Sequence, residues 1–104
     1  MIEDVALRRP ELRTLCRRFH VRRLDLFGSA ARGGDFDPAR SDLDFLVEFD
    51  RSDPRAMAFG AYFDFKEALE ELFGRSVDLV EASAVRNPYL KASIEASREA
   101  VFEA

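Results

Sequence analysis

The stretch Phe27-Gly28-Ser29-Ala30-Ala31-Arg32-Gly33, with Ser41-Asp42-Leu43-Asp44-Phe45-Leu46-Val47 after it, decides the fold of this chain. The first part places a glycine–serine turn directly after an apolar run, and the second places two aspartates one residue apart inside another apolar run. In a β-strand, side chains two residues apart point to the same face and lie roughly 6–7 Å apart. Asp42 and Asp44 are therefore expected to project side by side, where their charges repel unless a proton or a cation lies between them. Mg²⁺ is commonly bound by one or two carboxylates together with substrate phosphates, so the pair indicates a phosphate-handling site.

A third carboxylate, Asp78, lies in the predicted strand 77–80 between apolar neighbours. A charged residue in such a strand is unusual without a partner. We expect Asp78 either to complete the Asp42/Asp44 site from an adjacent strand or to be an edge-strand charge that opposes aggregation. An edge strand exposing charges to water is also the alternative for Asp42 and Asp44, although Leu46 on the same face favours a partly covered surface.

The residues after Gly28 predict a short helix with Ser29 as its N-cap, running through Arg32. A helix N-terminus offers free N–H groups to anions, and glycine lets a phosphate approach the backbone closely. A plain strand-to-helix turn is the alternative, and it is the better interpretation of a Gly-Ser pair taken alone.

Hydrophobic spacing and capping residues predict the other elements. They are a helix over 10–19, a strand over 21–27, a loop over 33–41, a strand over 43–49, a helix from Pro54 that ends at Gly74, and a helix over 88–103 with Asn87 as N-cap. Cys16 falls in the apolar stripe of the first helix and is assigned to the core, and His20 is assigned a structural or surface role. Phe59 and Phe63 lie beside the apolar stripe of the 54–73 helix, so they predict either a wide core face or a partner interface.

Length and composition predict one globular domain over residues 1–104, because the chain is near the usual domain size with 47% hydrophobic and 35% charged residues. No apolar run approaches the roughly 20 residues that span a bilayer, and the acidic N-terminus lacks a signal-peptide layout. The single cysteine excludes an intrachain disulfide, so we expect a cytoplasmic protein. The net charge of −4 argues against direct nucleic-acid binding.

Phe27-Gly28-Ser29, twelve residues, and then Asp42-Leu43-Asp44-Phe45 resemble the signature of the DNA polymerase beta-like nucleotidyltransferase superfamily. The fuller run from Gly28 to Asp44 is similar to its minimal nucleotidyltransferase branch, and so is the later Gly74-Arg75-Ser76-Val77-Asp78-Leu79-Val80. The resemblance covers roughly residues 10–103, and its three motifs occur in order with plausible spacing, which makes the combination specific. The resemblance implies an α/β (α+β) fold, a minimal palm with a small mixed β-sheet backed by helices.

The resemblance also assigns roles to residues of this chain. Gly28 and Ser29 match the positions that hold the triphosphate of a nucleotide, and Asp42 and Asp44 match the ligands of two Mg²⁺ ions. Asp78 matches the third carboxylate, which binds the catalytic metal and helps to deprotonate the attacking hydroxyl. Arg32 is a candidate to assist the phosphates, with bracing of the following loop as the alternative.

Minimal members of this family commonly pair with a small helical HEPN protein, a ribonuclease toxin, and act as its antitoxin. The resemblance therefore implies an Mg²⁺-dependent transfer of AMP from ATP to a hydroxyl, a tyrosine in the better-understood branch, of a HEPN partner. The Phe59/Phe63 surface and the C-terminal helix are candidate contacts. A binding-only antitoxin with a vestigial nucleotide site and a small-molecule nucleotidyltransferase are the alternatives, and the nucleobase and acceptor are left open.

Overall fold

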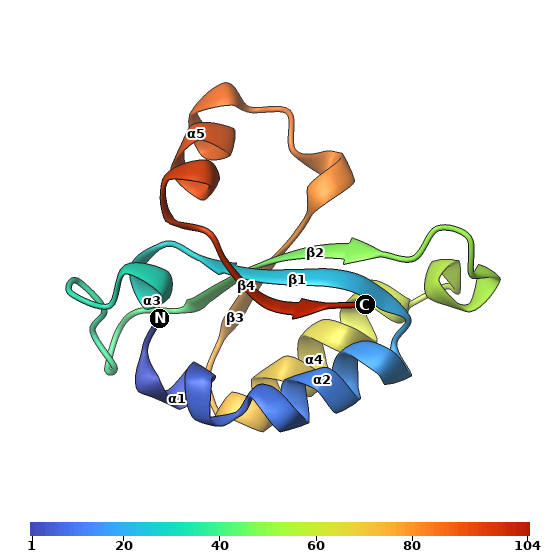
Figure 1. The fold of residues 1–104 in the computed structure, drawn as a ribbon, viewed down its shortest axis with the longest axis horizontal. Coiled ribbons are helices and arrows are strands. Elements are labelled where there is room, and N and C mark those ends of the chain that lie inside the picture. The colour runs from blue at the N-terminus through green and yellow to red at the C-terminus, as the bar shows by residue number, and fades with distance from the viewer.

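A four-stranded mixed β-sheet forms the centre of the computed structural model, which describes residues 1–104 (Figure 1). Its strands are β1 (Val21–Phe27), β2 (Leu43–Phe49), β3 (Val77–Glu81) and β4 (Glu99–Glu103), in the spatial order β3-β2-β1-β4. β1 pairs antiparallel with both β2 and β4, and β2 pairs parallel with β3. The predicted α/β class with a small mixed sheet is confirmed, and the three predicted strands are present at the predicted places.

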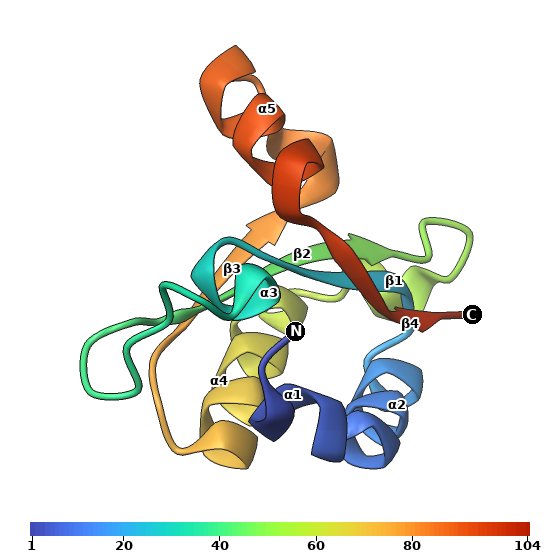
Figure 2. The same ribbon diagram turned by 60° about the vertical axis from the view of Figure 1, so that its left-hand side comes forward.

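Helices α2 and α4 cover one face of the sheet, and the short α1 lies beside them (Figures 1 and 2). Their bounds are α1 Glu3–Leu7, α2 Arg9–Arg18 and α4 Ala61–Phe73. Alternate residues of β2 point into this layer and are buried, as the period of two in its sequence predicts. The ring of Phe65 lies at the centre of the layer, with centroids 5.4 Å from Phe19 and 6.0 Å from Phe49. Cys16 is fully buried here, and burial raises the pKa of its thiol to about 12, so its assignment to the core is confirmed.

The opposite face of the sheet carries one helix, α5 (Pro88–Ser97), which rises away from the rest of the molecule (Figure 2). It is fastened by a small cluster of three buried residues, Phe27, Leu46 and Ile94. Asn87 caps α5 as predicted, because its side chain accepts the N–H groups of Tyr89 and Leu90. Leu46 is thus covered, as its position on the aspartate face of β2 suggested.

The predicted helix over 88–103 is wrong in its second half. The helix ends at Ser97, Arg98 is extended with φ −60° and ψ 138°, and the chain continues as β4. In β4, Phe102 pairs with Leu24 of β1 and is buried. The free edge of β1 therefore takes up this segment, and tertiary pairing outweighs its local helical preference.

The predicted continuous helix over 54–73 is also wrong, because it is broken near its start. A 3₁₀ helix, η1 (Pro54–Met57), is followed by extended Ala58 and by Gly60, whose φ of 85° is left-handed, and α4 begins only at Ala61. The predicted stop at Gly74 is confirmed by its left-handed φ of 64°. The break turns Phe59 out into solvent, and Phe63 on the first turn of α4 is also exposed, so the wide core face proposed for these two rings is wrong.

Two further short helices complete the chain, α3 (Ser29–Arg32) after β1 and η2 (Ala82–Ala84) after β3. Residues 33–41 form the predicted loop between α3 and β2. None of the helices has both the length and the apolar character that a membrane crossing requires.

Candidate functional site

The parallel pairing of β2 and β3 brings the predicted aspartates to one end of the two strands. Asp44 and Asp78 are register partners, and Asp42 directly precedes β2. Register partners in adjacent strands point to the same face of the sheet, so the carboxylates of β2 and β3 lie on the face that carries α5. β3 is an edge strand and Asp78 is exposed, so Asp78 is an edge charge as well as a neighbour of Asp44.

The electrostatics of Asp44 show that the three carboxylates act on one another. Its pKa is raised to about 6, first by burial and then by the negative charges of Asp78 and Asp42. The positive charge of Arg32 opposes this rise. Asp44 is half-buried, so a cation close to it would relieve both the repulsion and the cost of desolvation.

The turn after β1 lies directly against Asp44. Phe27, the last residue of β1, is the register partner of Asp44. Gly28 follows with φ 71° and ψ −152°, and a Cβ atom at this position would lie 2.5 Å from Oδ2 of Asp44. Only glycine allows both this backbone conformation and this close approach, so the spacing between the two motifs has a geometric reason.

The local role of Ser29 differs from the prediction. Gly28 is the N-cap of α3, its carbonyl oxygen accepts the N–H groups of Ala31 and Arg32 at 3.1 Å, and Ser29 is the first helical residue. The Ser29 side chain makes no capping hydrogen bond, so the predicted N-cap is wrong by one position. The N-cap residue is Gly28 because the positive φ and the close approach to Asp44 at this position require glycine.

Arg32 braces the loop that follows α3. Its Nε donates to Oδ1 of Asp35 at 3.2 Å and its Nη2 donates to Oδ2 at 2.7 Å. The hydrogen bonds from Arg32 lower the pKa of Asp35. The loop-bracing alternative is therefore present in the structure, and the positive charge of Arg32 also acts to lower the pKa of Asp44.

Two residues that the sequence patterns did not single out also border the site. Ser97, at the end of α5, accepts the Gly28 N–H on its Oγ at 2.9 Å. Asp25 of β1 is fully buried and accepts hydrogen bonds from Arg23 and Arg98. A carboxylate among leucines was the available signal for Asp25, whereas nothing local distinguishes Ser97 because it meets Gly28 only through the fold.

The donor set of this site suits a hard divalent cation, because all the candidate ligands are carboxylate oxygens. No group of three His, Cys, Asp or Glu residues forms a ready-made metal cage in the structure. That arrangement fits an ion such as Mg²⁺, which is usually held by one or two carboxylates and completed by substrate phosphates and water. Burial and the neighbouring negative charges raise the pKa of Asp44, and a bound cation would offset both effects.

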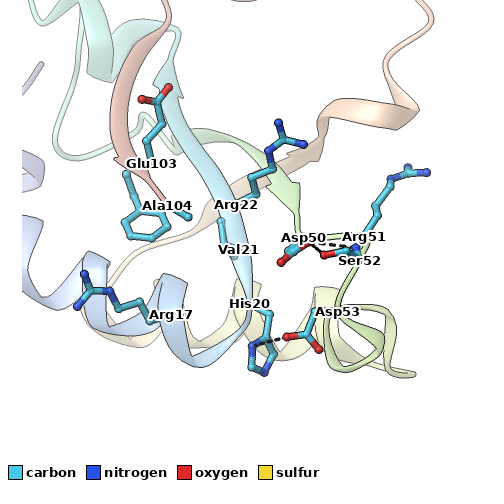
Figure 3. Close-up of a pocket in the computed structure, with 11 residues that line it drawn as sticks. Arg17, His20, Val21, Arg22, Asp50, Arg51, Ser52, Asp53, Glu103 and Ala104 are labelled. Carbon is cyan, nitrogen blue, oxygen red and sulfur yellow. Dashed lines mark hydrogen bonds and ion pairs between the residues drawn. The ribbon is translucent and has the colours of Figure 1, made fainter.

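The largest hollow of the molecule lies elsewhere and has a different character. It measures about 720 Å³ and is bordered by the ends of α2, β2 and β4, with His20 and Asp53 at its base (Figure 3). Cations and anions alternate around it, and Nδ1 of His20 lies 3.3 Å from Oδ2 of Asp53. It contains neither the aspartates of the β2/β3 end nor the glycine turn. The contact with Asp53 agrees with a structural role for His20. The open carboxylate end of β2 and β3 is the better candidate site.

A small mixed sheet with a glycine–serine turn against paired carboxylates defines a class of phosphate-handling α/β proteins. A family model described as nucleotidyltransferase domain matches residues 10–101. The chain is 40% identical over 75% of its length to a Methanocaldococcus jannaschii protein named "Putative protein adenylyltransferase", of which 74% is covered. It is 36% identical over 82% of its length to the protein adenylyltransferase MntA of Thermococcus cleftensis, of which 77% is covered.

Solved structures agree with these relatives. One, described as a "putative minimal nucleotidyltransferase", superposes with a TM-score of 0.71 at 32% identity and covers 93% of this chain and 92% of its own. Another, from Shewanella oneidensis, holds a tri-AMPylated HEPN toxin in complex with an MNT antitoxin, and matches in fold with a TM-score of 0.66 at 17% identity over 96% of this chain and 73% of that one. The chain belongs to the nucleotidyltransferase domain family, in its minimal nucleotidyltransferase branch, and is by homology a nucleotidyltransferase.

Proposed function

We propose that this protein is an Mg²⁺-dependent protein adenylyltransferase that modifies a HEPN-type toxin and so acts as its antitoxin. In this proposal AMP is transferred from ATP to a hydroxyl group of the toxin, and tyrosine is the acceptor that we expect. One observation carries the proposal: Asp44 and Asp78 are in register on parallel strands, with Gly28 packed against Asp44. The names of the relatives support protein adenylylation, and the AMPylated HEPN toxin in the Shewanella complex supports the kind of acceptor.

The proposed ligands of Mg²⁺ are Asp42, Asp44 and Asp78. Bound Mg²⁺ would neutralise phosphate charge and acidify the attacking hydroxyl, as in two-metal phosphoryl-transfer sites. The backbone turn at Gly28 and the hydroxyl and amide of Ser29 are proposed to hold the triphosphate, and Arg32 is proposed to approach the same phosphates when it leaves Asp35. A turn already fixed before the nucleotide arrives costs no reorganisation during the reaction.

The proposed reaction is an in-line displacement at the α-phosphorus of ATP. The acceptor hydroxyl oxygen forms the new P–O bond, the bond to the β-phosphate oxygen breaks, and pyrophosphate leaves. Asp78 accepts the hydroxyl proton, and its exposed position on the edge strand leaves it accessible to a protein acceptor. The roles of Asp44 and Asp78 thus follow their surroundings, since the more buried carboxylate holds the cation and the more open one meets the acceptor.

The exposed apolar residues at the start of α4 are proposed as the docking surface for that acceptor protein. Phe59 is fully exposed, Phe63 is 70% exposed and Met57 is 55% exposed. Tyr62 on the same turn donates its hydroxyl to the carbonyl of Leu79 in β3, next to Asp78 in sequence. A partner on this surface would therefore contact the chain beside the edge strand that carries Asp78.

The test is to incubate the purified chain with its candidate toxin partner, ATP and Mg²⁺, and to measure the intact mass of the partner. We expect the mass to increase by one or more AMP groups, and the increase to disappear with the Asp42→Ala/Asp44→Ala variant. Peptide mapping of the modified partner then identifies the acceptor residue. An unchanged mass together with a stable inhibitory complex would reject the enzyme and leave a binding-only antitoxin.

A further inference from the structure

The Gly28 turn is held from two sides. On one side its α-carbon lies so close to Asp44 that no Cβ fits between them. On the other side its N–H donates to Oγ of Ser97 at 2.9 Å. The Ser97 hydroxyl in turn donates to the carbonyl of Ser93, one turn earlier in α5, at 3.1 Å. The last turn of α5 is thereby connected to the turn that faces the carboxylates.

The next residue, Arg98, fastens the same helix end to the strand that leads into the turn. Its Nε and Nη2 donate to Oδ2 of Asp25 at 2.8 and 2.5 Å. Asp25 lies in β1 three residues before Gly28, and Arg23 donates to its other oxygen at 3.0 Å. Ser97 and Arg98 therefore hydrogen-bond to the Gly28 turn and to β1, respectively.

Asp25 fixes the position of Arg98. It is the one fully buried charged side chain of the chain, and burying a carboxylate is costly unless it is paired and hydrogen-bonded. Both of its oxygens have guanidinium donors, and no buried side-chain polar atom in the structure lacks a partner. Because any other placement of Arg98 would leave Oδ2 of this buried carboxylate without a donor, the neighbouring Ser97 hydroxyl is fixed opposite Gly28.

We propose that Ser97 is a positioning residue of the nucleotide site, which it serves by holding the Gly28 turn against Asp44. The inference rests on the proposed function and extends it to α5. The Gly28 N–H is committed to Ser97, so this amide sets the direction of the turn, and Ser29 and the residues beyond it are left to contact phosphates. Without the hydroxyl the turn gains freedom to rotate, which weakens triphosphate binding while the carboxylates keep their places.

The test compares Ser97→Ala and Ser97→Cys with a rescue variant, Ser97→Thr, and with Ser93→Ala. Threonine keeps a hydroxyl acceptor, whereas cysteine has nearly the shape of serine but is a weak acceptor. Ser93 is an exposed serine on the same helix whose carbonyl, not its hydroxyl, takes part in the network. Each variant is titrated by calorimetry with Mg²⁺ and α,β-methylene-ATP, whose α,β bond is not cleaved, and hydrogen exchange of the Gly28 amide is followed by NMR.

Ser97→Ala and Ser97→Cys are expected to bind the analogue about five- to tenfold more weakly, in line with the loss of one hydrogen bond, and to exchange the Gly28 amide faster. Ser97→Thr and Ser93→Ala are expected to match the unmodified protein. In AMP transfer, KM for ATP should rise more than kcat falls.

Unchanged affinity and exchange in Ser97→Ala, or equal losses in Ser93→Ala, would overturn the inference. A protein that binds the analogue as described but transfers no AMP would overturn the proposed function alone, because binding and exchange do not depend on an acceptor.

Discussion

The two faces of the same sheet differ in what they contain. The face toward α2 and α4 packs alternate residues of β2 into a cluster of 19 buried side chains, whereas the face toward α5 has a cluster of three. On that second face the same strand presents Asp44, and β1 presents the buried Asp25. A strand alternates its side chains between faces, so Phe45 of β2 packs into the large cluster while its neighbour Asp44 faces the candidate site. Substitutions on the two faces should therefore separate loss of folding from loss of activity.

The largest effect on folding is expected for Phe65→Ala on the α2/α4 face. Phe65 is fully buried between the rings of Phe19 and Phe49, and removing such a side chain costs about 3–5 kcal/mol of unfolding free energy. Phe63→Ala, two residues earlier on the same helix and exposed, should change it by no more than about 0.5 kcal/mol. Urea unfolding of both variants measures the difference, and similar losses would show that the two positions are not distinguished by burial.

The largest effect on activity is expected for Asp44→Asn on the α5 face. Loss of a preorganised charge in such a site should lower AMP transfer at least about a hundredfold. The unfolding free energy at neutral pH should not fall, because the substitution removes repulsion from Asp42 and Asp78. Glu48→Gln, further along the same strand, is the matched control and should keep the activity. A stable Asp44→Asn protein with full transfer would remove Asp44 from the mechanism.

How much of this contrast the sequence predicts depends on the range of the interactions involved. Period-two alternation in β2 is a local pattern, and the strand follows from it. The pattern leaves open whether Asp78 completes the aspartate site, because that depends on the pairing of β2 with β3. The left-handed turn at Gly28 also agrees with its residue type. Local chemistry was sufficient for the strand and the turn, because period-two alternation favours a strand and a positive φ favours glycine.

Other features depend on residues far apart in the chain. β4 exists because β1 offers an open edge to Phe102. Ser97 meets Gly28 across 69 positions, and no local pattern records that contact. Propensity and spacing therefore predicted the carboxylates of the site but not the residues that hold its glycine turn in place.

The proposed docking surface adds a third region to the comparison. Phe59→Asp and Phe63→Asp, made separately, should each weaken binding of the toxin partner at least about tenfold, because exposed aromatic anchors dominate many interfaces. Leu7→Asp is the control, since Leu7 is 70% exposed on the distant α1. Tyr89→Asp tests α5 as the second candidate contact. Calorimetry or co-purification measures the complexes, and intact binding in both phenylalanine variants would exclude this surface.

The ionisation of Asp44 is expected to change the unfolding free energy by about 1 kcal/mol between acid and neutral pH. This is less than the full pKa shift would give, because solvent screens a half-exposed group. Its pKa of about 6 in the folded protein lies above the ordinary aspartate value, so the folded state binds the proton more tightly than the unfolded state. The resulting stability is fully present below about pH 4 and is lost as the pH rises through 6. Urea unfolding at pH 4.5 and 7.5 without Mg²⁺ should show this loss, and Asp44→Asn should show less of it. If the unfolding free energy changes equally between the two pH values in both proteins, the group that takes up the proton is not Asp44.

The smallest expected effect distinguishes the two roles of Arg32 on the α5 face. If Arg32 assists the phosphates, Arg32→Ala should raise KM for ATP about threefold, which is the modest effect of one exposed charge. In that case Asp35→Ala should leave KM for ATP unchanged, or lower it because the guanidinium of Arg32 is released. If Arg32 only braces the loop, both substitutions break the same ion pair and should act alike. We expect the first pattern, because Arg32 already acts on Asp44 electrostatically. Steady-state kinetics of the two single variants and the double variant measures it, and equal KM values in all three would restrict Arg32 to the loop.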